Sequence, residues 1–303
     1  MAAALSGAPV YDLGDIPAAR ERRRALAEAT RSRAVAAPGV LVEERTLPRP
    51  GGPAGGDDVV VRIHRPSGGA AGGRLLWVHG GGHVLGEAAQ DDWLLADVVV
   101  RTGCTAVAVD WRRAPEHPFP AALDDCWAGL VWLAGQGGGP LVVAGASSGG
   151  GLAAGLVLLA RDRAEVRVDA QLLVYPMLDD RHLTPSSRAV TDPRVWHRGL
   201  NERAWAAYLG GEPGGAGVSP YAAPSRAEDL AGLPPTWMAT GELDAFVDED
   251  VDYAARLLRS GVSTELHVYP GAVHGFDLLA PDAAVSRRFA DDRAAAFERL
   301  LAV

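Results

Sequence analysis

The sequence predicts an α/β fold, with a mostly parallel central sheet and helices on both of its faces. Two observations support this prediction. Short apolar runs alternate with longer helical patterns from about residue 74 onward, and strands that alternate with helices tend to lie parallel in one sheet. The chain also has 303 residues, of which 48% are hydrophobic. A chain of this length and composition can bury a large core.

The expected elements begin with an amphipathic helix over Ala18–Arg33, where charged residues alternate with alanines. Two strands follow at Val40–Thr46 and Val59–His64, separated by a turn rich in Pro and Gly at Pro48–Gly56. Further strands are expected at Leu75–Val78, Thr105–Val109, Leu141–Ala144, Ala170–Tyr175, Pro235–Thr240 and Thr264–Tyr269. Helices are expected near Asp91–Arg101 and at Ala121–Ala134, Ser148–Arg161, Asp248–Arg259 and Ala284–Leu301.

The segment Asp179–Leu233 interrupts the alternation. It is too long for a simple connection, and its bulky aromatic side chains, notably Trp196, Trp205 and Tyr208, are unusual in a disordered linker. We therefore expect it to form a cap above the carboxyl edge of the sheet, where ligands of such sheets bind. The segment as a whole would then roof the site, while packing within the cap is an equally good explanation for any single one of these aromatic side chains.

A cap divides the chain into parts. Residues 1–40 are expected to be a helical segment that joins the cap, and residues 179–233 to be the cap insertion. Residues 41–178 and 234–303 would form the main α/β domain. Because a roof limits the size of a bound molecule, the site should favour small to medium ligands.

Composition excludes several function classes. The formal net charge of −9 argues against a general nucleic-acid partner, and all 29 Lys+Arg residues are arginine, so a Walker phosphate loop, which needs lysine, is absent. Cys104 and Cys126 lie in apolar segments and are expected to be buried thiols. We find no apolar signal core and no apolar run of membrane-spanning length. The expectation is a cytoplasmic protein without stable membrane insertion.

Two glycine-rich segments follow two of the expected strands. Residues His79–Gly82 read His-Gly-Gly-Gly, and residues Gly145–Gly149 read Gly-Ala-Ser-Ser-Gly. The second frame suits a sharp strand-to-helix turn that exposes a serine hydroxyl, and the first offers backbone N–H groups that can bind a developing oxyanion. Either segment alone is weak in a chain with 37 glycines. Together, each after a strand, they favour an acyl-transfer site.

The glycine frame selects Ser147 as the nucleophile, because Ser148 would have Ala146 instead of glycine two residues before it. Ser148 would then contribute its backbone N–H to the oxyanion site. A serine hydroxyl needs a base. His274 follows the last strand in a loop that can reach the turn, whereas His267 lies within that strand and is expected to be a sheet side chain.

The base needs a carboxylate to orient it. Asp244 comes just after the strand Pro235–Thr240, where sheet enzymes build their sites, and is the favoured candidate. Glu242 and Asp248 are its rivals. Structural roles explain both rivals adequately: Glu242 as a polar residue of the turn, and Asp248 as a carboxylate at a helix N-terminus.

From about residue 40 onward, the chain resembles the hormone-sensitive-lipase-like carboxylesterases of the α/β-hydrolase fold, and its motifs fit bacterial members. The similar segments are His79–Gly82, Asp110–Ala122, Gly145–Gly150, Tyr175–Arg181, Val218–Tyr221, Asp244–Glu249 and His274–Phe276. The resemblance implies a serine esterase that acts through an acyl-enzyme on a small-molecule ester with short to medium acyl chain, without cofactor or metal.

The resemblance also implies a Ser147–Asp244–His274 triad. It places the oxyanion hole at Gly81, Gly82 and Ser148.

Three residues depart from the family pattern. Ala146 and Ser148 flank Ser147 where the family usually has Asp and Ala, and His83 stands where an aromatic residue is common. These changes leave the usual substrate preference open. Alternative functions are amide or acetyl-group hydrolysis on a specialised metabolite, and non-catalytic binding of a small molecule. The sequence also leaves the oligomeric state open, a homo-oligomer included.

Overall fold

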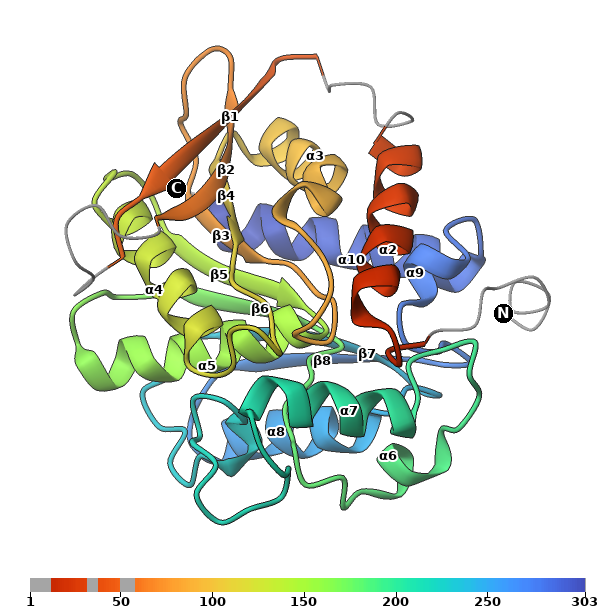
Figure 1. Ribbon diagram of the computed structural model, residues 1–303. Helices are drawn as coiled ribbons and strands as arrows, with labels where there is room; N and C mark the ends of the chain where they lie inside the picture. The colour runs from red at the N-terminus through yellow and green to blue at the C-terminus, as the bar shows by residue number, and fades with distance from the viewer. Residues whose placement is uncertain (1–11, 32–37, 50–57, 303) are drawn as a thin grey trace.

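The computed structural model describes residues 12–31, 38–49 and 58–302. In this part of the chain, eight strands form one sheet in the order β1-β2-β4-β3-β5-β6-β7-β8 (Figure 1). The strands are β1 (Val40–Leu47), β2 (Val59–Pro66), β3 (Arg74–Val78), β4 (Thr105–Asp110), β5 (Leu141–Ala146), β6 (Ala170–Val174), β7 (Thr236–Gly241) and β8 (Thr264–Tyr269). β2 is antiparallel to β1 and β4, and the other neighbouring strands are parallel. The predicted fold class is confirmed.

Helices cover both faces of the sheet (Figure 1). The helices are α2 (Ile16–Arg31), α3 (Asp92–Thr102), α4 (Ala121–Ala134), α5 (Ser148–Arg163), α6 (Pro185–Ala189), α7 (Arg198–Leu209), α8 (Val247–Arg259), α9 (Phe276–Leu279) and α10 (Ala284–Leu301), with short 3₁₀ turns η1 (Ala88–Asp91) and η2 (Pro224–Arg226). α3 and α10 pack on one face, and α4, α5 and α8 pack on the other. No helix in the described ranges is long and apolar enough to cross a membrane.

The expected elements lie within two residues of their observed ends. The last two residues of the helix expected over Ala18–Arg33 lie outside the described residues, as does most of the expected turn at Pro48–Gly56. Alternate side chains of the central strands enter opposite cores: Leu76 and Val143 face one, Leu75 and Val142 the other. Since the parallel strands share one direction, the loops after β3, β5, β7 and β8 meet at one edge.

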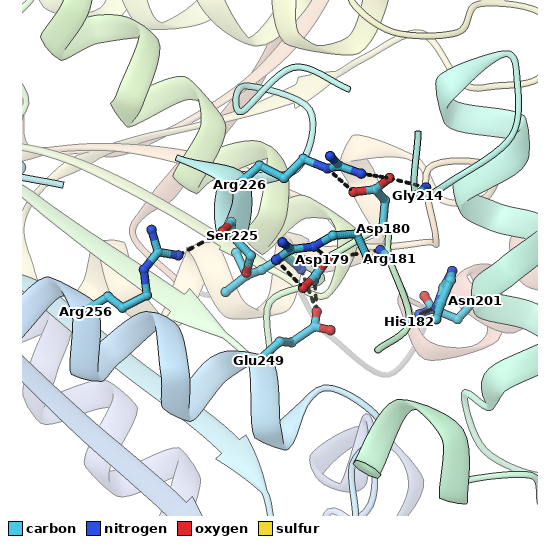
Figure 2. A network of polar contacts seen from close by, with 11 residues as sticks. Asp179, Asp180, Arg181, His182, Asn201, Gly214, Ser225, Arg226, Glu249 and Arg256 are labelled. Carbon is cyan, nitrogen blue, oxygen red and sulfur yellow. Dashed lines mark hydrogen bonds and ion pairs between the residues drawn. The ribbon is translucent and has the colours of Figure 1, made fainter. Parts of the chain in front are cut away.

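A network of polar contacts ties the segment between β6 and β7 to α8 (Figure 2). Asp180, fully buried near the start of this segment, forms an ion pair of 2.6 Å with Arg226 near its end. Glu249 on α8 accepts hydrogen bonds from the N–H groups of Leu178 and Asp179 at 2.8 and 3.2 Å. Burial raises the pKa of the Glu249 carboxyl. The two ends of the segment are thus joined to each other and to the helix that follows Asp244.

Candidate active site

Ser147 occupies a sharp turn between β5 and α5. Its backbone has φ 58° and ψ −125°, a strained conformation for a residue with a side chain. The turn closes only because Gly145 and Gly149 lack side chains: a Cβ on Gly145 would overlap the carbonyl of Gly149, and one on Gly149 the carbonyl of Val78. The expected glycine frame therefore has a steric cause.

Three loops bring a serine, a histidine and an aspartate together. Ser147 Oγ lies 2.9 Å from His274 Nε2, and His274 Nδ1 lies 2.7 Å from Asp244 Oδ2. Asp244 follows β7 and is 1% exposed, while His274 follows β8. The distances suit hydrogen bonds along the whole chain of three side chains.

The directions of these bonds follow from donor and acceptor capacity. An ionised carboxylate only accepts, so His274 Nδ1 donates to Asp244 and Nε2 is left to accept from the Ser147 hydroxyl. The other oxygen of Asp244 accepts from the Phe246 N–H at 3.0 Å, which fixes the carboxylate in its loop. This arrangement can take a proton from the serine.

The rival residues lie elsewhere. His267 pairs with Glu265 at 2.7 Å on β8. Glu242 accepts from the Gly271 N–H at 2.8 Å, and Asp248 accepts from the Ser186 N–H at 2.7 Å. The Ser148 side chain is buried without a hydrogen-bond partner among the described residues. These contacts explain the rivals as local structure.

The glycine turn after β3 borders the same serine. Gly81 has φ 144° and Gly82 has φ 60°, and a Cβ on Gly82 would overlap the ring of Trp196. The Gly81 carbonyl accepts from the Leu85 N–H at 2.8 Å, which holds the turn. Within the described residues, the N–H groups of Gly81, Gly82 and Ser148 donate no hydrogen bond. They are available to an oxyanion beside Ser147.

Two buried histidines surround this turn. The His79 ring stacks on Trp111, with 4.6 Å between ring centroids, and His83 stacks on Tyr208 at 3.7 Å. Burial lowers the pKa of each imidazole to about 3. Both rings are therefore neutral at ordinary pH and serve here as aromatic packing.

A cavity of about 170 Å³ opens at Ser147 and His274. Of the three aromatic residues named in the segment between β6 and β7, Trp196 lines the cavity, whereas Trp205 and Tyr208 do not. Trp205 is fully buried and lies with Tyr208 against His83. For these two residues the alternative holds, because their rings pack against His83 and not above the serine.

Trp196 is held in place from within the same segment. Its Nε1 donates to Asn201 Oδ1 at 3.2 Å, and Asn201 Nδ2 lies 3.1 Å from His182 Nδ1. Figure 2 shows Asn201 and His182 beside the polar network. Sequence reasoning missed both residues, because neither belongs to a motif.

The N-terminal helix α2 also reaches the site. Arg20 donates to the carbonyls of Val84 and Ala114, both at 2.8 Å, and pairs with Glu116 at the same distance. This guanidinium lowers the pKa of Glu116 to about 2. The contacts fix α2 against the loop that follows the glycine turn, and Arg23 of α2 lines the cavity.

Comparisons with known proteins find α/β-hydrolases and esterases. A sequence model of the α/β-hydrolase fold family matches residues 75–278. Carboxylesterase NlhH of Mycobacterium tuberculosis is 36% identical over 265 residues, which cover 82% of this chain and 80% of the relative. The structure of a bacterial heroin esterase has a TM-score of 0.93 and 42% identity, covering 100% of this chain and 97% of that one. The structure of esterase LipW from Mycobacterium marinum has a TM-score of 0.85 and 36% identity, and the match covers 96% of this chain and 91% of that one.

Proposed function

This chain belongs to the hormone-sensitive-lipase-like esterases of the α/β-hydrolase fold, and from that premise we propose how it hydrolyses carboxylic esters. Ser147 is the nucleophile, His274 the general base and Asp244 the residue that orients it. The hydrogen-bonded chain of these side chains, next to the unpaired N–H groups of the glycine turn, carries the proposal.

In the first half of the reaction, Ser147 Oγ attacks the ester carbonyl carbon while His274 Nε2 takes the hydroxyl proton. The carbonyl oxygen becomes an oxyanion, which the N–H groups of Gly81, Gly82 and Ser148 stabilise. The tetrahedral intermediate collapses, the alcohol leaves with the proton from His274, and the acyl group remains on Ser147.

In the second half, a water molecule attacks the acyl-enzyme. His274 accepts a proton from this water, and the same N–H groups hold the second oxyanion. Collapse returns the proton to Ser147 and releases the carboxylic acid. Every proton transfer uses the imidazole, so the reaction requires no metal or organic cofactor.

We also propose that residues 179–233 and α2 form the cap. Trp196 and Arg23 bring one side chain from each part to the cavity wall. A cavity of about 170 Å³ beneath such a cap suits short to medium acyl esters. A small-molecule ester as the partner follows from the site, while a cytoplasmic location stays a prediction.

The test is a comparison of the two neighbouring serines. Ser147→Ala should lower kcat on p-nitrophenyl acetate by roughly 10⁴-fold, because the nucleophile is lost. Ser148→Ala should have a small effect, because its backbone N–H remains. Labelling with a fluorophosphonate and mapping the modified peptide gives an independent answer, and a label on Ser148 would reverse the assignment.

A further inference from the structure

The cavity that holds Ser147 also contains two arginine side chains that the proposed catalysis does not use. Arg23 belongs to α2 and Arg293 to α10, and both line the cavity. Neither donates a hydrogen bond to any residue in the described part of the chain. A guanidinium has five N–H donors, so both side chains keep donors that no residue in the described part of the chain accepts.

Arg293 is held rigidly. Its side chain is 8% exposed, and its guanidinium lies over the rings of Phe289 and Trp93, 4.8 and 5.7 Å from their centroids. Asp277 Oδ2 lies 3.5 Å from Arg293 Nη1, while the other Asp277 oxygen accepts from the Tyr175 hydroxyl at 3.0 Å. The aromatic rings fix the plane of the guanidinium without using its donors.

Asp91 completes the charged part of the wall. It is 9% exposed, and its Oδ2 accepts from Trp77 Nε1 at 2.7 Å. Burial raises the pKa of this carboxyl, although the charges of Arg23 and Arg293 oppose the shift. The wall therefore carries two cations, Arg23 and Arg293. Of the two carboxyl groups beside them, Asp277 pairs with Arg293, and burial disfavours the charged form of Asp91.

This wall should discriminate between ligands by their polarity. A buried N–H donor left without an acceptor costs about 1–3 kcal/mol. Water can satisfy the guanidinium groups in the free enzyme. An alkyl chain would displace this water without accepting a hydrogen bond from the guanidinium groups. An oxygen acceptor on the ligand would instead form charge-assisted hydrogen bonds with them.

We propose that the cavity selects esters whose non-reacting part carries an oxygen hydrogen-bond acceptor, such as a carboxylate or a second carbonyl, and that Arg23 and Arg293 bind this group. The inference rests on the proposed function, since it assumes that the scissile ester lies at Ser147. The proposal specifies the chemical class of the ester, in addition to the limit that the cavity volume sets on its size.

Two matched substrate series test the inference on the full-length enzyme. The first contains p-nitrophenyl hexanoate, 5-oxohexanoate, hemiadipate and 6-aminohexanoate, and the second contains acetates of the matching alcohols. In at least one series, kcat/KM should be about 10-fold higher for the oxo or carboxylate member than for the alkyl member, the effect of one such hydrogen bond. The ammonium member should be the poorest. Equal values, or a preference for the alkyl or ammonium member in both series, would overturn the proposal.

Variants connect the preference to the arginines. Arg293→Met and Arg23→Met should each bring the acceptor-to-alkyl ratio of kcat/KM close to one. Arg22→Met, at the exposed neighbouring position of α2, is the matched control and should keep the ratio. If Arg293→Met fails to fold, Arg23→Met, on a half-buried surface position, still decides the question, and an unchanged ratio there contradicts the proposal.

The two proposals fail in different ways. An enzyme without activity on p-nitrophenyl acetate would refute the proposed function. An enzyme that hydrolyses the acetate and shows no preference for acceptors would refute only the role of the arginines.

Discussion

Backbone constraints place each residue of the proposed triad differently. Ser147 depends on a strained turn that flanking glycines permit. Asp244 depends on a loop in which the Phe246 N–H holds its second oxygen, and His274 depends on the loop that follows β8. Because the backbone holds each position, replacing one of these side chains should change catalysis while the fold stays intact.

Asp244→Asn is the sharpest single-residue test of the acid. The amide can donate to His274 Nδ1 and thereby favour the tautomer that cannot accept the serine proton, so kcat should fall by roughly 10³–10⁴-fold with little change in fold. Steady-state kinetics and a melting curve measure both quantities. Glu242→Gln is the matched control, since among the described residues this rival accepts a hydrogen bond only from the Gly271 N–H. A larger loss of kcat in the control would show that the wrong carboxylate is assigned.

His83→Phe tests the cost of burying a neutral histidine. The folded pKa of His83 is about 3, below the unfolded value of about 6.5. Between these values the unfolded chain binds a proton that the folded chain does not, so stability is complete above pH 6.5 and falls as the pH drops. At pH 5 this loss is on the order of 2 kcal/mol.

His83→Phe should remove that share of the pH dependence. Urea unfolding at pH 7.5 and pH 5 gives the difference in free energy of unfolding for each protein. Because each protein is compared with itself, any strain of Phe at this positive-φ position cancels. If the free energy of unfolding falls by the same amount between pH 7.5 and pH 5 in the wild type and in the variant, His83 is not neutral in the folded protein.

At the scale of elements, the segment between β6 and β7 combines two kinds of aromatic side chain. Trp196 contacts the glycine turn and lies 6.3 Å from the His274 ring, between centroids. Trp205 lies 5.6 Å from the His83 ring and is fully buried. One aromatic therefore shapes the cavity while the other anchors α7.

Matched truncations separate these two roles. Trp196→Phe shortens the cavity wall and loses the bond to Asn201, so kcat/KM on p-nitrophenyl octanoate should rise several-fold relative to the acetate, because each additional buried CH₂ contributes about 0.8 kcal/mol. Trp205→Phe should lower the free energy of unfolding by roughly 1–3 kcal/mol without changing this ratio. The reverse pattern would place the roof at Trp205.

At the scale of the whole molecule, the sheet separates two cores that must both be intact for the chain to stay folded. Cys104 belongs to the core under α3 and α10, and Cys126 to the core under α4, α5 and α8. Both thiols are free and buried. Burial raises the pKa of Cys104 to about 11 and raises the pKa of Cys126 well above its ordinary value.

The two thiols should consequently report opening of each face. An aromatic disulfide reagent at pH 8 should label neither thiol in the native protein, because the thiolate is scarce and covered. Both should react in urea, with the same midpoint if the molecule unfolds in one step. Serine variants of each cysteine assign the signals. Rapid labelling of either thiol in the native protein would contradict the observed burial.

Local patterns in the sequence were sufficient for the strands and for the longer helices outside the segment between β6 and β7, whereas α6, α7 and α9 were not predicted. They were also sufficient to select the residues of the proposed triad. A strand such as β8 and a helix such as α10 are decided by side-chain periodicity within a few residues. The Ser147 turn is likewise local, because Gly145 and Gly149 make it sterically possible. His274 and Asp244 could be selected because loops after parallel strands meet at one edge.

Only the tertiary structure decided what surrounds that serine. Arg23, Asp91 and Arg293 are distant in the chain, and no periodicity indicates that they line one cavity. The same holds for the different places of Trp196 and Trp205, whose identical side chains are nine residues apart. Local sequence determines which segments form strands, helices and turns, whereas the wall of a cavity depends on how distant segments pack, and that is a property of the complete fold.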